Sequence, residues 1–559
     1  MDTQRLLLFV ALSFFSLMLW DAWQAENQPT QDPSLLFSTQ NSTQPPISTA
    51  PAEREQTGMP RVSAPEAGGA EPIVQTLIES LPTATKITIE TDLLNLEIDT
   101  AGGDIRKVDL LKHGKSSEDR VTPFRLMDQS TPFFIVQSGI MGGKGTEKTR
   151  YPDHNVIYSS EQSHYTMLGG DRVVVPMVWE DAATGIKITK SYTFYRDSYK
   201  IDLNYHVENS GSQDWRGGLY TQLLRDAEAP EAENSFIYTY TGGVTYTTEE
   251  HYQKIDFDEM DEITPIRNAE NGWVAMIQHY FLAAVVPNKG DNPTLYTDIQ
   301  SHDRYAIGAV LPIVTVAAGD SSDLSIQIYS GPKDQDRLEE LAEGLELTVD
   351  YGWLTFLAQP IFWTLKQIQS VVINWGFSIV LLTILIKLIF FKLSETSYRS
   401  MARMRKLSPR LASLKERFGD DRQKMNEAMM KMYKEEKVNP MGGCLPILVQ
   451  IPVFIALYWV LLESVEIRQA PFMLWIQDLS AKDPYYILPL IMGASMMIQQ
   501  KLNPAPIDPI QQKVMMVLPV VFTVFFAFFP AGLVLYWVVN NIISISQQWY
   551  ITKKIEAAN

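Results

Sequence analysis

Long apolar runs alternate with polar stretches along the chain, and they gather near its two ends. One run lies near the N-terminus, and five follow one another after residue 376. Runs of this length and composition are typical of transmembrane helices. The sequence therefore predicts six spans, over Leu6–Trp20, Phe377–Phe391, Met441–Leu462, Tyr485–Ile498, Val514–Phe529 and Leu533–Tyr550.

The charges of the connecting segments predict the orientation of these spans. Lys392–Lys437 holds thirteen basic and seven acidic residues, whereas Glu463–Asp483 holds four acidic residues and only Arg468 and Lys482 as basic ones. Basic loops stay on the cytoplasmic side of a membrane. We therefore expect the first segment in the cytoplasm, the second outside, and both termini of the chain in the cytoplasm.

The first apolar run and the polar segment after it do not have the composition of a folded domain. Trp20 and Trp23 stand where a signal peptide would have small residues before its cleavage site. We therefore favour an uncleaved transmembrane anchor over residues 1–25 rather than a signal peptide. Residues 26–82 are rich in Gln, Ser, Thr, Pro and Ala, which is typical of a flexible linker.

Between residues 83 and 345, polar and apolar residues alternate over short segments. Lys86–Glu90, Ile186–Phe194 and Tyr199–Val207 show this period of two, and Thr241–Gly242–Gly243 is expected as a turn. Many such segments with few helical patterns predict a large antiparallel β-sandwich. All seven histidines of the chain fall here without metal-ligand spacing, so we expect no metal site.

Residues 346–376 and 394–438 carry helical patterns outside the spans. The first segment is apolar and aromatic with interspersed Gln and Lys, and it predicts an amphipathic helix in the outer membrane interface. Pro360 could begin that helix, but we do not expect it inside the helix, because proline lacks the backbone N–H. The second segment predicts a cytoplasmic helical hairpin with a basic face suited to docking other chains, at Arg403, Arg405, Lys406, Arg417, Asp420 and Asp421.

The formal net charge of −18 hides two unlike halves of the chain. Of the 47 basic and 65 acidic residues, 25 and 51 lie in residues 21–350, which leaves 22 and 14 elsewhere. The acidic part argues against nucleic-acid binding, because affinity for phosphate requires cations. The only cysteine is Cys444, so an intrachain disulfide is excluded.

Lys387 is the only basic residue inside the six apolar runs. Thr383 lies four residues earlier, on the same face of a helix. A charge in the apolar layer costs about 3 kcal/mol unless it faces water or a partner. One alternative is that Lys387 merely extends to the cytoplasmic interface beside Lys392. We favour a hydrated functional face, in which water, amides and hydroxyls accompany Lys387, because no Asp, Glu or His lies near the centre of any run.

The same shortage of reactive groups argues against an enzyme. The spans contain no serine–histidine pair, no paired aspartates and no HExxH motif, and the chain has no glycine-rich phosphate loop. Titratable carboxylates at mid-membrane, which ion-coupled transporters usually carry, are absent as well. We therefore expect no catalytic residue, no cofactor and no enzymatic activity.

Three stretches are more specific than any single motif. They are MDTQRLLLFVALSFFSLMLWDAW at the start, VNPMGGCLPILVQIPVFIALYWVLLESVEIRQAPFMLWIQDLSAKDPYYILP, and FPAGLVLYWVVNN near the end. These stretches resemble the YidC membrane-protein insertase family in its Gram-negative bacterial form. The resemblance implies an inner-membrane protein with a periplasmic β-supersandwich domain over residues 83–345. It also implies a five-helix insertase core over residues 377–559.

The resemblance also implies which residues meet an incoming chain. It places a hydrophilic groove, open to the cytoplasm and to lipid, at Thr383, Lys387, Gln450, Phe528 and Asn540. It places apolar contacts to the incoming chain at Ile451, Phe454, Phe525 and Tyr536. Lys387 stands where the family generally has arginine, a change that keeps the charge but loses the planar fork of donors.

We hypothesise that the groove attracts a hydrophilic segment of a nascent membrane protein, whose apolar segment then passes into lipid. The resemblance implies the Sec translocon, the ribosome and signal recognition particle pathway, and membrane lipids as partners. One alternative is a lipid or solute transporter, which radiotracer flux would reveal. The other is a carbohydrate-binding periplasmic module with a membrane anchor, which would lose its function on deletion of residues 30–340.

Overall fold

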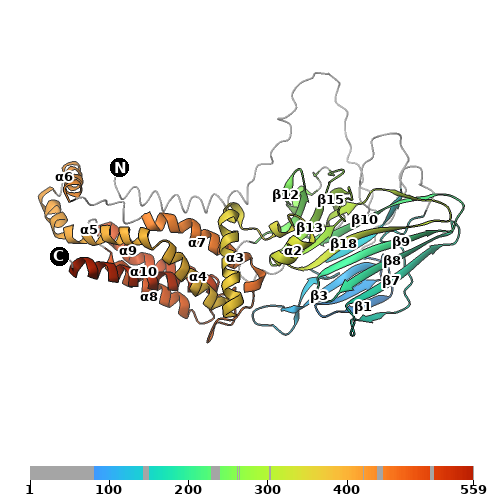
Figure 1. Cartoon of the computed structure of the whole chain (residues 1–559), viewed down its shortest axis with the longest axis horizontal. Helices are drawn as coiled ribbons and strands as arrows, with labels where there is room; N and C mark the ends of the chain where they lie inside the picture. Colours follow the sequence, from blue (N-terminus) through green and yellow to red (C-terminus); the bar gives the residue numbers. More distant parts are fainter. Residues whose placement is uncertain are drawn as a thin grey trace, which may run out of the picture.

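The computed structural model describes residues 81–557 except 143–149, 228–238, 261, 264, 301–303, 419–420, 437–444 and 504–508. Within these residues the chain forms a β domain and then a helical part, which lie next to each other along the long axis of the molecule (Figure 1). This order confirms the prediction of an all-β domain followed by a helical part. The expected anchor, nearly all of the linker, Asp420 and Cys444 lie outside the described residues.

The β domain consists of two sheets that share one buried core. The ten-stranded sheet has the order β15-β16-β10-β5-β3-β2-β1-β6, with β4 paired to β3 and β17 paired to β10. Its strands are β1 (Lys86–Glu90), β2 (Leu94–Asp99), β3 (Asp104–Gly114), β4 (Pro123–Met127), β5 (Phe134–Gly142), β6 (His164–Thr166), β10 (Trp215–Asp226), β15 (Thr294–Gln300), β16 (Arg304–Val310) and β17 (Val314–Val316).

The eight-stranded sheet has the order β12-β11-β13-β14-β18-β9-β8-β7. In β8, residues Ile186, Ile188, Lys190, Tyr192 and Phe194 are buried while the residues between them are half-exposed, as a period of two requires. The strands are β7 (Arg172–Asp181), β8 (Ile186–Tyr195), β9 (Lys200–Asn209), β11 (Thr241–Thr247), β12 (His251–Ile255), β13 (Trp273–Gln278), β14 (Phe281–Val286) and β18 (Ser321–Pro332).

The expected turn at Gly242–Gly243 is wrong, because both glycines lie in β11. A Cβ on Gly242 would stand 2.5 Å from the hydroxyl oxygen of Tyr240, and one on Gly243 would stand 2.5 Å from Cε of Met260. Real Cβ atoms do not approach other atoms that closely. The two glycines therefore make room for larger side chains that pack onto the strand, rather than reversing the chain.

The helices follow the β domain in the order of the sequence. After the short η2 (Phe257–Glu259) within the β domain, they are α2 (Gln335–Leu341), η3 (Leu345–Thr348), η4 (Gly352–Leu354), α3 (Thr355–Val372), α4 (Trp375–Ile389), α5 (Phe391–Phe418), α6 (Arg422–Glu435), α7 (Leu445–Glu463), η6 (Val465–Ile467), α8 (Ile487–Leu502), α9 (Pro509–Phe526) and α10 (Ala531–Ala557). Most of these helices run along the long axis of the molecule (Figure 1).

Helix α3 crosses the other helices at the end of the helical part that faces the β domain (Figure 1). Ile361 and Leu365 on one face are buried, whereas Trp363 on the other is exposed, which is an amphipathic arrangement. Pro360 lies inside α3, contrary to expectation. The proline forfeits one helical hydrogen bond, to the carbonyl of the residue four positions earlier. Here that residue is Phe356, which is exposed.

Among the described residues, no single helix is both long and apolar enough to cross a membrane alone. Helix α4 and the first part of α5, up to Leu407, meet this condition only as a pair that is bent by 67°. The number of spans therefore stays a prediction.

Helices α5 and α6 pack against each other at the end of the molecule away from the β domain (Figure 1). Leu407, Leu411 and Tyr433 form a small buried cluster between them, and methionines pack around it. Asp421 begins α6, because its side chain accepts a hydrogen bond of 3.1 Å from the backbone N–H of Lys424.

Candidate functional site

Helix α4 has two different faces, and Lys387 lies on the buried one. Ile379, Leu382, Thr383, Ile386 and Lys387 are buried, at the spacing of three and four residues that places them on one side. The opposite side exposes apolar side chains, namely Phe377, Leu381, Ile384, Leu385 and Leu388. An exposed apolar face is what a helix presents to lipid, so the lysine faces the neighbouring helices instead.

The ammonium of Lys387 has neutral acceptors around it. Its Nζ donates to Oγ of Ser544 on α10 at 2.8 Å and to Oε1 of Gln450 on α7 at 3.4 Å. Only 3 % of the Lys387 surface is exposed. Within the part of the chain that the structure describes, no carboxylate pairs with this ammonium, so the site keeps a net positive charge when Lys387 is protonated.

The other predicted groove residues surround this site unequally. Thr383 is buried one turn away, but its hydroxyl donates to the backbone carbonyl of Ile379 at 2.6 Å and not to another helix. Asn540 is half-buried on α10, and its backbone carbonyl accepts a hydrogen bond of 2.7 Å from the hydroxyl of Ser544. The structure thus brings Lys387, Gln450 and Ser544 into one polar cluster, which Asn540 contacts only through its backbone carbonyl.

The sequence led us to expect an open groove at Lys387, whereas Lys387 is covered in the structure. The lysine is covered by its neighbours, and α10 packs against α4, α5 and α7 around it. Ser394, Ser397 and Tyr398 at the start of α5 are buried as well. The described arrangement is therefore a covered polar cluster.

Most of the predicted apolar contact residues lie in a cluster of aromatic rings on α7, α9 and α10. The ring of Phe454 stacks on that of Tyr536, with 6.0 Å between centroids, and meets Trp537 edge-on at 4.4 Å. Trp537 contacts Phe526 at 5.0 Å, and Phe526 contacts Phe525 at 5.4 Å. Phe454, Phe525 and Tyr536 thus belong to one continuous series of contacting aromatic rings, in which Tyr536 and Phe526 are buried and Phe525 is exposed. Ile451 is half-buried, next to Gln450 on α7.

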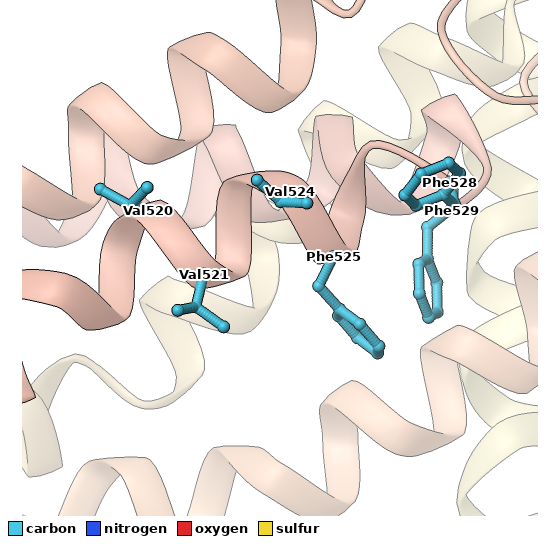
Figure 2. Close-up of a pocket in the computed structure, with 6 residues that line it drawn as sticks. All are labelled: Val520, Val521, Val524, Phe525, Phe528 and Phe529. Atoms are coloured by element: carbon cyan, nitrogen blue, oxygen red, sulfur yellow. The ribbon is translucent and has the colours of Figure 1, made fainter.

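Phe528 lies with Phe525 rather than in the polar cluster. The two phenylalanines line an apolar hollow of about 460 Å³ on α9 and the turn after it (Figure 2). The hollow is lined by Val520, Val521, Val524, Phe525, Phe528 and Phe529. Five of these side chains are substantially exposed, which makes this the apolar outer side of α9.

The predicted docking residues of the hairpin are accessible where the structure describes them. Arg403, Arg405, Lys406 and Arg417 are exposed on α5. Asp421 is the N-cap of α6, so its carboxylate also stabilises the start of that helix.

Sequence reasoning missed Ser544 as the nearest partner of Lys387. A second missed contact lies along the same helix, where Nδ2 of Asn541 donates to Oγ of Ser495 on α8 at 3.0 Å. Both residues stood among the few polar residues of the apolar runs. That polarity was the available signal, but the pairing of helices decides which polar residues meet.

Comparison with known proteins covers almost the whole described chain. Two family models match adjoining parts, the YidC periplasmic domain over residues 86–364 and the 60Kd inner membrane protein over residues 367–558. A solved structure, described as an active YidC insertase with its first transmembrane domain resolved, covers 85 % of this chain and 94 % of that one. It is 17 % identical with a TM-score of 0.38, which is too low to carry an argument.

Curated relatives match from end to end. Proteins named membrane protein insertase YidC from Alkalilimnicola ehrlichii and Nitrosococcus oceani are 49 % and 50 % identical to this chain. The alignments cover 100 % of this chain in both cases, and 96 % and 99 % of the two relatives. Identity at this level over full length shows common descent and a common fold. The chain belongs to the YidC family of membrane protein insertases.

Proposed function

We propose that this protein inserts nascent membrane proteins into the bacterial inner membrane, and that the charge of Lys387 draws their acidic segments inward. The names of the relatives and the inner-membrane family model support the general activity. The route through Lys387 rests on a single observation. Among the residues that the structure describes, this lysine ammonium is buried between apolar helices with only a hydroxyl and an amide as acceptors.

A cation in this setting attracts acidic side chains of a client protein. Burial of a charge away from water is costly, and neutral acceptors offset only part of that cost. An acidic side chain that approaches Nζ of Lys387 gains more from the ion pair there than in water, because the effective dielectric constant is lower. The cluster therefore reduces the cost of moving a short acidic segment part of the way across the apolar layer.

Access to the cluster requires movement of a helix that covers it. Helix α5 starts directly after the break at Phe390, and its first turns pack against α10. We propose that displacement of these turns opens the cluster towards the cytoplasm, as the hydrophilic groove requires.

The apolar segment of the client would leave along these aromatic rings. Phe454 and Tyr536 connect the neighbourhood of Gln450 with Trp537 and α9. The hollow around Phe525 and Phe528 continues the series of rings to the exposed side of α9 (Figure 2). A client helix that moves along these rings stays in contact with apolar groups until lipid surrounds it.

The proposed topology has six spans, with the β domain in the periplasm and the α5–α6 hairpin in the cytoplasm. The hairpin and the β domain lie at opposite ends of the molecule, which supports this assignment (Figure 1). The exposed basic residues Arg403, Arg405, Lys406 and Arg417 would then meet the ribosome or the signal recognition particle. The β domain would meet the Sec translocon, and the exposed aromatic face of α3 would rest on lipid.

The test replaces Lys387 in vesicles that contain only this protein. Lys387→Ala should slow the insertion of a single-span client with an acidic tail by about tenfold, Lys387→Glu should slow it further, and Lys387→Arg should retain most of the rate. Insertion is measured as protection of the translocated tail from added protease.

Lys392→Ala is the matched control, because Lys392 is an exposed lysine only five residues away. It should leave the rate unchanged, as should Lys387→Ala with a client whose tail has been made neutral. Equal rates for the acidic and neutral tails in every variant would refute the role of the charge. Solute flux through the same vesicles would instead favour a transporter.

A further inference from the structure

The loop after α7 touches the β domain and two helices of the core at once. We call residues 464–481 the hub loop. It follows Glu463, the last residue of α7, and contains η6. Its contacts with the β domain and with the ends of α4 and α10 lead to an inference that does not depend on the route proposed through Lys387.

A buried ion pair joins the β domain to the start of the hub loop. Lys333, directly after β18, donates through Nζ to Oε2 of Glu463 at 2.8 Å and to the carbonyl of Thr348 at 3.2 Å. The side chains of Lys333 and Glu463 are only 2 % and 7 % exposed. Next to this pair, Nε2 of His279 lies 3.2 Å from the carbonyl of Leu462. The β domain is therefore fastened to the end of α7.

A second set of contacts holds the middle of the hub loop. Arg468 donates to the carbonyl of Gly114 at 2.9 Å, and its guanidinium lies over the rings of Phe124 and Phe281. The side-chain amide of Gln469 bonds to the backbone of residues 114 and 116. Arg120 donates back to the carbonyls of Gln469 and Gln477, at 3.3 and 2.6 Å. The β3–β4 connection and the hub loop are thus held together by hydrogen bonds that each donates to the other.

The same loop holds the ends of the two helices that carry Lys387 and Ser544. Asn374 caps α4, accepting from the N–H of Phe377 at 3.0 Å, and its Nδ2 donates to the carbonyl of Phe472 at 3.0 Å. At the start of α10, the N–H groups of residues 531 and 532 donate to the carbonyls of Ala481 and Leu479 at 2.7 and 2.9 Å. Any shift of the hub loop therefore shifts both helix ends.

We propose that the Lys333–Glu463 pair is a positioning joint, through which the β domain sets the hub loop and so fixes the outer ends of α4 and α10. A buried ion pair adds little net stability compared with apolar groups, but the loss of one partner leaves a buried charge unpaired. Such a pair therefore specifies one arrangement of the parts that it joins. The β domain acts on the core through this joint.

Hydrogen exchange in the full chain tests the joint directly. Lys333→Met should raise exchange at least about tenfold in residues 464–481 and at the first turns of α4 and α10, because local opening becomes easier. Exchange in β8 and β9 should not change. Glu463→Gln, which keeps the shape of the side chain, is the second variant should Lys333→Met fail to fold. The double variant Lys333→Met with Glu463→Met removes both charges and should restore slow exchange, because no buried charge is then left unpaired.

The matched control is Lys254→Met, which removes an exposed lysine that pairs with Asp350 in the same region of the molecule. It should leave exchange in the hub loop unchanged. The joint is refuted if the single variants leave the exchange of the hub loop and of both helix ends as in the parent chain. It is also refuted if β8 and β9 exchange faster by the same factor, or if the double variant stays as fast as the single ones. None of these readings depends on client insertion.

Discussion

The surroundings of Lys387 show how a buried cation is held without a carboxylate. Ser544 supplies the shorter contact at 2.8 Å, whereas Gln450 lies at 3.4 Å. The serine hydroxyl also donates to the carbonyl of Asn540, which leaves its lone pairs directed towards the ammonium. Because hydrogen bonds to charged groups are stronger than those between neutral groups, most of the local stabilisation comes from this hydroxyl.

Replacing Ser544 by alanine should therefore destabilise the helical part. The ammonium would keep only the longer contact to Gln450, and we expect a loss of about 2 kcal/mol in the free energy of unfolding. Thermal unfolding in detergent measures this loss as a lower midpoint. Ser546→Ala is the control, because Ser546 is exposed and its hydroxyl likewise donates to a carbonyl of its own helix, that of Ile542, at 2.8 Å. Equal midpoints for the two variants would contradict the role of Ser544.

Buried histidines make the β domain sensitive to acid. His154 is 5 % exposed, and its Nδ1 lies 2.6 Å from the hydroxyl of Tyr220. Burial is the main cause that lowers the pKa of His154 from 6.5 to about 4; the charge of Asp153 opposes this shift, and those of Lys190 and Arg106 add to it. The folded state thus holds His154 neutral, while the unfolded chain takes up a proton below pH 6.5.

Stability should accordingly fall as the pH drops from about 6.5 towards 4. His154 alone contributes up to about 3 kcal/mol to this loss. Urea unfolding, followed by circular dichroism at pH 7 and pH 4.5, measures it. His154→Gln should reduce the difference between the two pH values, whereas His164→Gln, at an exposed position, should not. The same slope in both variants would show that His154 is not involved.

At the scale of elements, strands with one buried face could be predicted from the sequence alone. The period of two over Lys86–Glu90 corresponds to β1, and that over Ile186–Phe194 lies within β8. One face of each strand packs into the core and the other does not, so apolar and polar residues alternate along the sequence. The helical hairpin predicted over residues 394–438 corresponds to α5 and α6, whose facing apolar side chains form a small buried cluster.

Elements whose form depends on distant packing could not be predicted. Gly242 and Gly243 lie in β11, and these positions hold glycine because Tyr240 and Met260 fill the space that a Cβ would need. The absence of Asp, Glu and His near the centres of the apolar runs indicated that Lys387 has no carboxylate nearby. Its partner Ser544 could not be predicted, because it is 157 residues away in the chain. Only the packing of α10 against α4 brings the two together. The covered state of the polar cluster has the same origin.

At the scale of the whole molecule, the two parts share one buried interface. The β domain is an acidic sandwich with its own core, and the helical part has a separate core built from α3, α4, α7, α8, α9 and α10. Two cores of this kind usually belong to units that fold separately. Here Lys333 and Glu463 cross between them and are both buried. Removal of either part therefore exposes a charge that the other had paired.

Deletion of residues 30–340 should leave insertion measurable but slow. The helical part keeps the polar cluster and the aromatic rings, whereas the hub loop loses the contacts that position it and Glu463 becomes exposed to water. Adding Glu463→Gln to the deletion should leave the insertion rate nearly unchanged, because a hydrated carboxylate needs no partner. The measurement is protease protection of a single-span client in vesicles that contain only the shortened chain. In the full chain the same Glu463→Gln change should lower the rate, because there it breaks the buried pair. An effect in the full chain alone distinguishes the joint from a general requirement for glutamate at this position. A shortened chain without any insertion, with or without Glu463→Gln, would instead place an essential part of the activity in the β domain.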